Sequence, residues 1–169
     1  MDLEVSHSGA GWHASFGERR WPCAMGRGGV RGDKTEGDGA TPAGRWPIRR
    51  VLYRADRLER PATVFRCDPL QPHDGWCDEP GDPRYNRLVR LPYGGRHERL
   101  WRDEAVYDCI VVLGYNDAPV CDGTGSAIFL HVARPDLAPT EGCVALRRAD
   151  LLEFLKSASE SSRVCVAPP

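Results

Sequence analysis

The sequence predicts a mainly β, loop-rich protein with one or two short helices, folded as a single domain over residues 1–169. Two observations support this fold class. The chain contains 18 glycines and 14 prolines, well above average usage. Its apolar residues come in short runs rather than long helical patterns. A chain of this length can bury about 70% of its unfolded surface, so we expect a core without disulfide or metal support.

The first third of the chain predicts short strands and one long loop. Residues 1–25 are expected to form short β pieces, and residues 46–58 one or two strands. Between them, residues 26–44 form a glycine-dense loop with little regular structure. This loop lacks the GxxxxGK[ST] pattern and the strand–loop–helix setting of a phosphate-binding loop, so phosphate binding is not predicted.

Buried strands are predicted in the second half. Residues 66–87 are a second long loop rich in Pro, Asp and Gly, and residues 98–104 suit a short helix. Residues 107–115 and 127–133 are rich in β-branched and apolar side chains, which indicates two buried strands. The turn-rich segment 116–125 between them is typical of an antiparallel pair.

The C-terminal region predicts one helix and a last strand. Leu151, Leu152 and Leu155 fall at helical spacing within residues 149–157, and Asp150 stands in the first turn, near the positive end of the helix dipole. Residues 163–166 then suit a short strand.

Charge and cysteine content exclude several classes of protein. A net charge of −1 gives no support to binding of nucleic acid or of a membrane surface, and no apolar run is long enough for a membrane span. The seven cysteines are odd in number and form no CxxC pair, which argues against a disulfide framework. The first residues lack a signal-peptide pattern, so we expect a cytoplasmic protein, or a periplasmic one if the start is mis-assigned.

The segment SAIFLHVARPDLAPTEGCVAL, residues 126–146, contains the candidate catalytic pair. Alternation within the strand puts Phe129, His131 and Ala133 on one face. Cys143 follows His131 by twelve residues, and a hairpin-like return of the chain would bring the two side chains together.

A cysteine and a neighbouring histidine are the minimum set of side chains that thiol acyl transfer requires. A neighbouring imidazole lowers the pKa of a thiol from about 8.5 and generates the nucleophilic thiolate. Gly142 allows close backbone approach, so the amides of Gly142 and Cys143 suit a developing oxyanion. The alternative is structural, because most cysteines are small core residues and a lone strand histidine is usually a satisfied core residue.

The run HVARPDLAPTEGCVAL resembles the active-site segment of YkuD-type L,D-transpeptidases, in which a His precedes a loop and a [ST]-x-G-C signature. The run GRGGVRGDKTEGDGATPAGRWPIRRVLYR is similar to the GDGxTPxG region on the substrate side of that family. Segments at 74–87 resemble its small branch without a signal peptide. The resemblance covers roughly residues 20–157.

This resemblance implies a β-sandwich-like fold and a catalytic Cys143. Its thiol would attack the meso-diaminopimelate carbonyl of a peptidoglycan stem tetrapeptide or muropeptide and expel D-alanine. His131 would activate the thiol, with its ring oriented by the Val132 carbonyl. Thr140 matches the family's Ser/Thr, and Gly142 with Cys143 matches its oxyanion hole. The resemblance implies no cofactor, and it implies a carbapenem β-lactam as an inhibitor.

The chain departs from the family pattern on the side where the acyl acceptor would bind. Glu141 replaces a frequent His, Ala145 replaces a frequent Arg or Asn, and the interval from His to Cys is short. These changes leave open whether an amine or water accepts the acyl group. Water would make the chain similar to cytosolic L,D-carboxypeptidases that trim recycled tetrapeptides. A non-catalytic muropeptide-binding module is a third alternative.

Other residues are candidates for substrate binding. Arg and Lys side chains suit carboxylates, although solvated surface charge is the simpler interpretation. The expected contacts are Lys34, Thr41, Trp76, Arg87, Arg134 and Glu141. Cys67, His73 and Cys77 lack paired ligand spacing, so no metal site is predicted.

Overall fold

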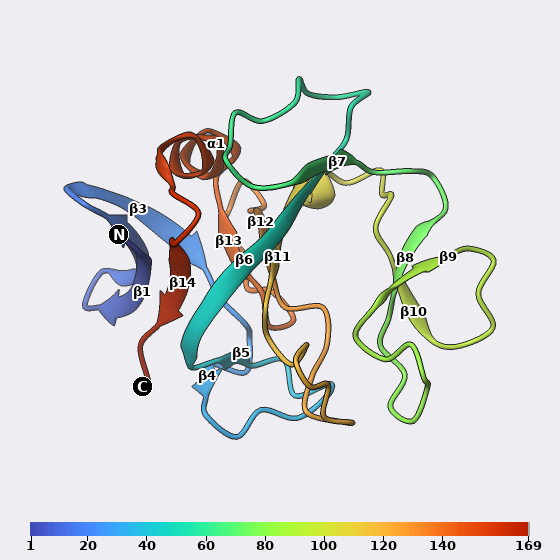
Figure 1. Ribbon diagram of the computed structural model, residues 1–169. Coiled ribbons are helices and arrows are strands. Elements are labelled where there is room, and N and C mark those ends of the chain that lie inside the picture. The colour runs from blue at the N-terminus through green and yellow to red at the C-terminus, as the bar shows by residue number, and fades with distance from the viewer. Residues whose placement is uncertain (169) are drawn as a thin grey trace.

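The computed structural model describes residues 1–168 and shows a large sheet that curls and closes on itself (Figure 1). Its nine strands run in the order β11-β12-β13-β3-β2-β1-β14-β6-β7, and β6 pairs in addition with β11, which closes the barrel. The strands of this sheet are β1 Leu3–Ser8, β2 Gly11–Phe16, β3 Arg19–Ala24, β6 Gly44–Tyr53, β7 Cys67–Pro69, β11 Cys109–Leu113, β12 Phe129–Val132, β13 Val144–Leu146 and β14 Arg163–Val166.

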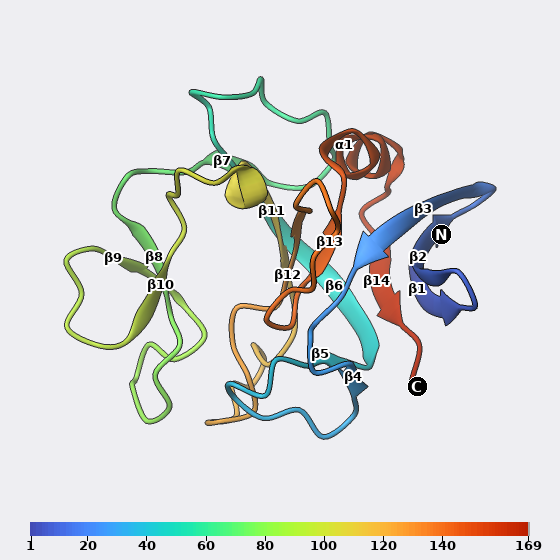
Figure 2. The ribbon, with the colours of Figure 1, turned by 180° about the vertical axis from the view of Figure 1, so that it is seen from behind.

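Two smaller sheets lie beside the barrel. One has the order β10-β8-β9, with β8 Asp74–Cys77, β9 Leu88–Arg90 and β10 His97–Arg99. The other pairs β4 Val30–Arg31 with β5 Thr41–Pro42. Figures 1 and 2 show the three-stranded sheet standing apart from the barrel, on the side of β11 and away from β1 and β14.

The barrel interior forms the main hydrophobic core, and the helix α1, Arg148–Ser157, completes it. Leu151, Phe154 and Leu155 of the helix are fully buried in this core, and the Phe154 ring meets Phe16 edge-on at 5.2 Å. Such an edge-to-face pair adds to the stabilisation that comes from burying apolar area. The helix therefore seals the core with the face that its leucine spacing predicts, except that Leu152 is only partly buried.

A second apolar cluster covers the outer wall of the barrel, between β11, β12 and the three-stranded sheet. Its fully or nearly fully buried members are Leu52, Leu70, Trp76, Leu100, Val106, Tyr107, Ile110, Val112, Phe129 and Cys143. Leu130 and Val132 face the barrel interior, while Phe129 belongs to the outer cluster, so the predicted alternation of residues 127–133 is confirmed. The candidate nucleophile thus lies outside the barrel.

Most predicted elements are confirmed, including the mainly β class. The buried strands around 109–113 and 129–132 pair antiparallel, the helix spans 148–157, and β14 has the predicted bounds. The helix predicted at 98–104 is wrong. Residues 97–99 pair with β8 as β10, and the short 3₁₀ helix η1, Ala105–Tyr107, follows instead.

The two predicted loops contain short strands, and one predicted connection differs. Residues 26–44 include β4 and β5, while residues 66–87 include β7 and β8. The hairpin-like return between His131 and Cys143 is wrong, because β12 and β13 are parallel neighbours. Residues 1–168 contain no helix that is both long and apolar enough to cross a membrane.

We predict that Leu151→Ala lowers the free energy of unfolding by about 2–5 kcal/mol, since the lost side chain leaves a cavity in the core. The adjacent change Leu152→Ala removes the same atoms from a partly buried position and should cost about 1 kcal/mol or less. Urea unfolding monitored by circular dichroism measures both. Equal losses in the two variants would contradict the packing of this helix.

Candidate active site

His131 and Cys143 are brought together by the parallel pairing of β12 and β13. His131 is the register partner of Ala145, so Cys143 lies just before β13, beside the strand that carries the histidine. Both residues line one cavity of about 560 Å³. Its walls come from the barrel side, the three-stranded sheet and the loops at residues 34–37 and 134–141. The cavity is large enough for a peptide side chain and the atoms around a scissile bond.

The Cys143 thiol is held by backbone groups of the neighbouring segment. It donates a hydrogen bond to the Ala127 carbonyl at 3.2 Å, and the Phe129 N–H donates to the sulfur at 3.3 Å. Only 7% of the residue surface is exposed, and this surface opens into the cavity. Burial raises the pKa of Cys143 to about 12, and the negative charge of Glu98 acts in the same direction.

The His131 ring is fixed by backbone and aromatic contacts. Its Nδ1 lies 2.9 Å from the Val132 carbonyl, so Nδ1 carries the proton and donates, and Nε2 is the basic nitrogen. The Tyr107 ring packs edge-on against the imidazole at 5.3 Å. Burial lowers the pKa of His131 to about 4, although the carbonyls of Val132 and Val106 favour the protonated ring.

Cysteine and histidine are therefore both neutral at pH 7. The sequence predicts that the imidazole lowers the pKa of the thiol, but desolvation raises the pKa of Cys143 and lowers that of His131. A buried site disfavours an ion pair of thiolate and imidazolium until a substrate changes the surroundings.

The loop before Cys143 is hydrogen-bonded to residues 25–27, which follow β3. The Thr140 N–H donates to the Met25 carbonyl, the Arg27 N–H donates to the Thr140 carbonyl, and Gly26 and Thr140 form a parallel bridge. The Thr140 hydroxyl donates to the Cys143 carbonyl at 2.6 Å and accepts from the Gly142 N–H at 3.2 Å. Thr140 thus sets the backbone conformation on both sides of Gly142.

Gly142 is required by its backbone angle and by its neighbour. Its φ is +137°, and a Cβ there would lie 2.8 Å from the Ala40 carbonyl oxygen. A side chain at this position would be strained and would push the loop away from residues 38–41. Ala40 is therefore the close backbone neighbour that requires glycine at this position.

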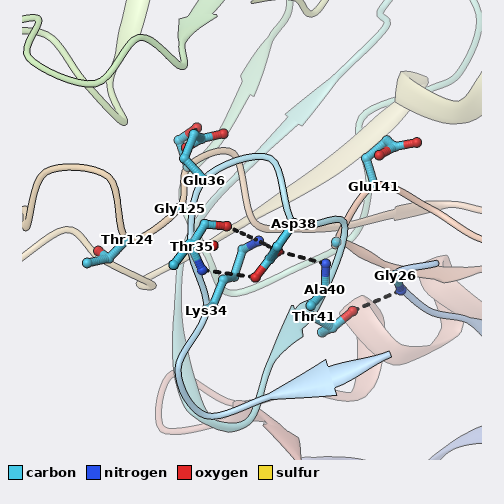
Figure 3. Close-up of polar contacts among 12 residues, drawn as sticks. Gly26, Lys34, Thr35, Glu36, Asp38, Ala40, Thr41, Thr124, Gly125 and Glu141 are labelled. Carbon is cyan, nitrogen blue, oxygen red and sulfur yellow. Dashed lines mark hydrogen bonds and ion pairs between the residues drawn. The ribbon is translucent and has the colours of Figure 1, made fainter. Parts of the chain in front are cut away.

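A buried ion pair organises the glycine-dense loop, as Figure 3 shows. The Lys34 ammonium is 2.6 Å from Asp38, which also accepts from the N–H groups of Thr35 and Ala40. Burial opposes ionisation of Asp38, but Lys34 and these two donors together hold the pKa of the carboxyl below its usual value. Lys34 lines the cavity with its charge already neutralised.

Three of the six predicted substrate-binding residues line the cavity. Lys34 is one, and Arg134 and Glu141 lie at its other side. Arg134 is paired with Glu104 at 3.1 Å, and Glu141 is paired with Arg27 at 2.8 Å, both in exposed positions.

The other three occupy different places, because each has a partner elsewhere. Thr41 is buried and accepts the Gly26 N–H (Figure 3). Trp76 donates its indole N–H to Asn86 within the outer cluster, and Arg87 donates to the Asp117 carbonyl. Both border a separate, smaller depression of about 160 Å³. None of these three predicted substrate-binding residues lines the main cavity.

Sequence reasoning missed a cluster of three residues in the cavity wall. Glu98 accepts from the Tyr107 hydroxyl at 2.5 Å and from Arg102 at 2.7 Å, and the Arg102 guanidinium lies over the Tyr107 ring at 4.5 Å. Desolvation raises the pKa of Glu98. A strand of three residues leaves no readable alternation, so only the pairing of β10 with β8 reveals that Glu98 faces the cavity.

Residues 15–166 match the family described as the L,D-transpeptidase catalytic domain, YkuD. The chain belongs to the YkuD family. The match spans nearly the whole chain, including the glycine-dense loop and the Cys143 loop, so the resemblance seen in the motifs extends to the fold. No curated protein and no solved structure shows significant similarity.

The other six cysteines of this YkuD-family chain are not among the residues that line the main cavity. All seven thiols are free, and burial raises the pKa of Cys23 and Cys109 to about 12. Within residues 1–168, the ligand atoms of Cys67, His73 and Cys77 do not converge. Asp2, Glu4 and Cys165 do lie together near the N-terminus, with Asp2 and Cys165 held by Arg45.

We predict that His131 makes stability dependent on pH between about 6.5 and 4. The unfolded histidine binds a proton below pH 6.5, whereas the folded one does so only near pH 4, so stability falls as the pH drops through this window. From pH 7 to 4.5 this loss should be about 2–3 kcal/mol. Denaturant unfolding at both pH values measures it.

The control for this measurement is His131→Asn, which cannot titrate. Its own loss of stability between the two pH values should be smaller than that of the wild type by the stated amount, whatever its absolute stability at pH 7. Equal losses in both proteins would contradict the prediction, because they would show that folding leaves the pKa of His131 near its ordinary value.

Proposed function

We propose that the protein is a cysteine acyltransferase that acts on peptidoglycan stem tetrapeptides at the bond between meso-diaminopimelate and D-alanine. The supporting observation is that Cys143 and a His131 ring oriented by the Val132 carbonyl line the same cavity in a YkuD-family chain. The reaction forms a thioester on Cys143 and releases D-alanine.

The first step starts from the neutral pair. When the peptide fills the cavity, the Cys143 S–H turns from the Ala127 carbonyl towards Nε2 of His131. As the proton moves to Nε2, the sulfur attacks the carbonyl carbon, and the resulting oxyanion is held by backbone N–H groups around Gly142 and Cys143. The C–N bond then breaks, and the imidazolium returns the proton to the leaving amine of D-alanine.

The second step needs an acceptor for the acyl group. His131, neutral again, takes a proton from the acceptor as it attacks the thioester, and the thiol is restored. An amine acceptor gives a cross-link, and water gives a tripeptide. Two features support water as the alternative acceptor: Glu141 at the cavity edge is bound to Arg27, and Ala145 leaves that wall without a polar side chain.

We predict that incubation with a disaccharide-tetrapeptide releases D-alanine and that Cys143→Ala abolishes this release. Mass spectrometry of the digest identifies the acceptor, because a dimer indicates transpeptidation and a tripeptide without dimer indicates carboxypeptidase activity. The variants Cys67→Ala and Cys77→Ala serve as controls and should retain turnover. Full activity of Cys143→Ala would refute the mechanism.

A carbapenem separates an enzyme from a non-catalytic muropeptide-binding module. The strained lactam should acylate Cys143, so the intact mass should rise by the mass of the drug in the wild type and not in Cys143→Ala. A wild-type protein that binds muropeptide but gains no adduct would support the binding module.

A further inference from the structure

The charges that line the cavity are compensated with one exception. Its four cations are each bound to a carboxylate, in the pairs Lys34–Asp38, Arg96–Asp78, Arg102–Glu98 and Arg134–Glu104. Of its four carboxylates, Asp78 and Glu98 belong to these pairs, and Glu141 is bound to Arg27. Glu36 forms no salt bridge with any of residues 1–168, so it leaves the cavity one negative charge in excess.

Glu36 is nevertheless held firmly, by two neutral donors on one oxygen. Tyr85 donates its hydroxyl to Oε2 at 2.5 Å and Ser126 donates to the same atom at 2.8 Å. The backbone N–H of Glu36 donates to the Gly123 carbonyl. Two segments distant in sequence, at Tyr85 and at residues 123–126, therefore hold Glu36, so its position is not that of a freely solvated surface side chain.

The second carboxylate oxygen, Oε1, is left for a ligand. Within residues 1–168 no buried side-chain oxygen lacks a hydrogen-bond partner, and Oε1 accepts none, so Oε1 keeps exposed surface on a residue that lines the cavity. In Figure 3 the Glu36 side chain points away from the Lys34–Asp38 pair. Glu36 is also near the nucleophile, because Ser126 precedes Ala127, whose carbonyl accepts the Cys143 thiol.

We propose that Glu36 binds a primary ammonium group on the side chain of the residue whose carbonyl Cys143 attacks. A single fixed carboxylate with one free oxygen suits an ammonium, which is a compact point charge. A guanidinium prefers both oxygens in a fork, but Oε2 is already occupied by two hydroxyls. This inference rests on the proposed function and assigns to Glu36 the recognition of the side-chain amine at that position.

The test compares two tetrapeptides that differ only at the third residue, one with a free side-chain amine and one with that amine acetylated. Glu36→Gln keeps a carbonyl oxygen for Tyr85 and Ser126 but removes the charge. It should lower kcat/KM for the free amine by about tenfold or more and leave the acetylated peptide nearly unchanged. Glu160→Gln, the same change at an exposed residue, should alter neither.

A binding measurement keeps this test separate from the proposed chemistry. In the Cys143→Ala protein, calorimetry should show tighter binding of the free amine, and adding Glu36→Gln should remove that preference. Equal effects of Glu36→Gln on the two peptides, or no effect on either, would overturn the inference. If the protein turns over neither peptide, the proposed reaction is wrong. The ammonium site is still supported in that case, provided that the preference for the free amine is lost in Glu36→Gln.

Discussion

The parallel pairing of β12 with β13 is the constraint on which the site depends. It sets His131 opposite Ala145, and so fixes where the chain must place Cys143. Parallel neighbours require a long connection, and here residues 133–143 supply it without a helix. That connection reaches the chain after β3 and is bound there through Thr140, which carries the Cys143 backbone to the cavity wall. Without this pairing, the position of the thiol relative to the imidazole would not be fixed.

The electrostatics follow from where this pairing places the two groups. Both lie outside the barrel in an apolar cluster built on Trp76, Tyr107 and Phe129, and desolvation keeps them uncharged. A neutral thiol is less reactive towards oxidants and stray electrophiles than a thiolate. In the proposed reaction, nucleophilic attack therefore requires a ligand that enters the cavity and replaces the contacts of the resting sulfur.

Much of the fold could be predicted from sequence because its signals are local. The β-branched runs at β11 and β12, the leucine spacing of α1 and the TEGC motif each carry their own pattern. The site was only partly predictable, since Glu98 of β10 meets Tyr107 of η1, and Glu36 meets Tyr85, through side-chain contacts that no local pattern indicates. The same limit explains Trp76 and Arg87: their residue types suited a binding role, but the register of β8 and β9 turned them to another surface.

The close contact between the two loops that frame the thiol also limits how such a site changes during evolution. Gly142 of the Cys143 loop lies so near the Ala40 carbonyl of the glycine-dense loop that its position does not accommodate a methyl group. An insertion in one loop would displace the other, so the two must vary together. Gly75, the glycine within the three-stranded sheet, closely approaches Val89, Leu91 and Glu98 of that sheet and its connections rather than the Cys143 loop. Diversification of substrate range among relatives of this chain should therefore be concentrated in that sheet and its connections.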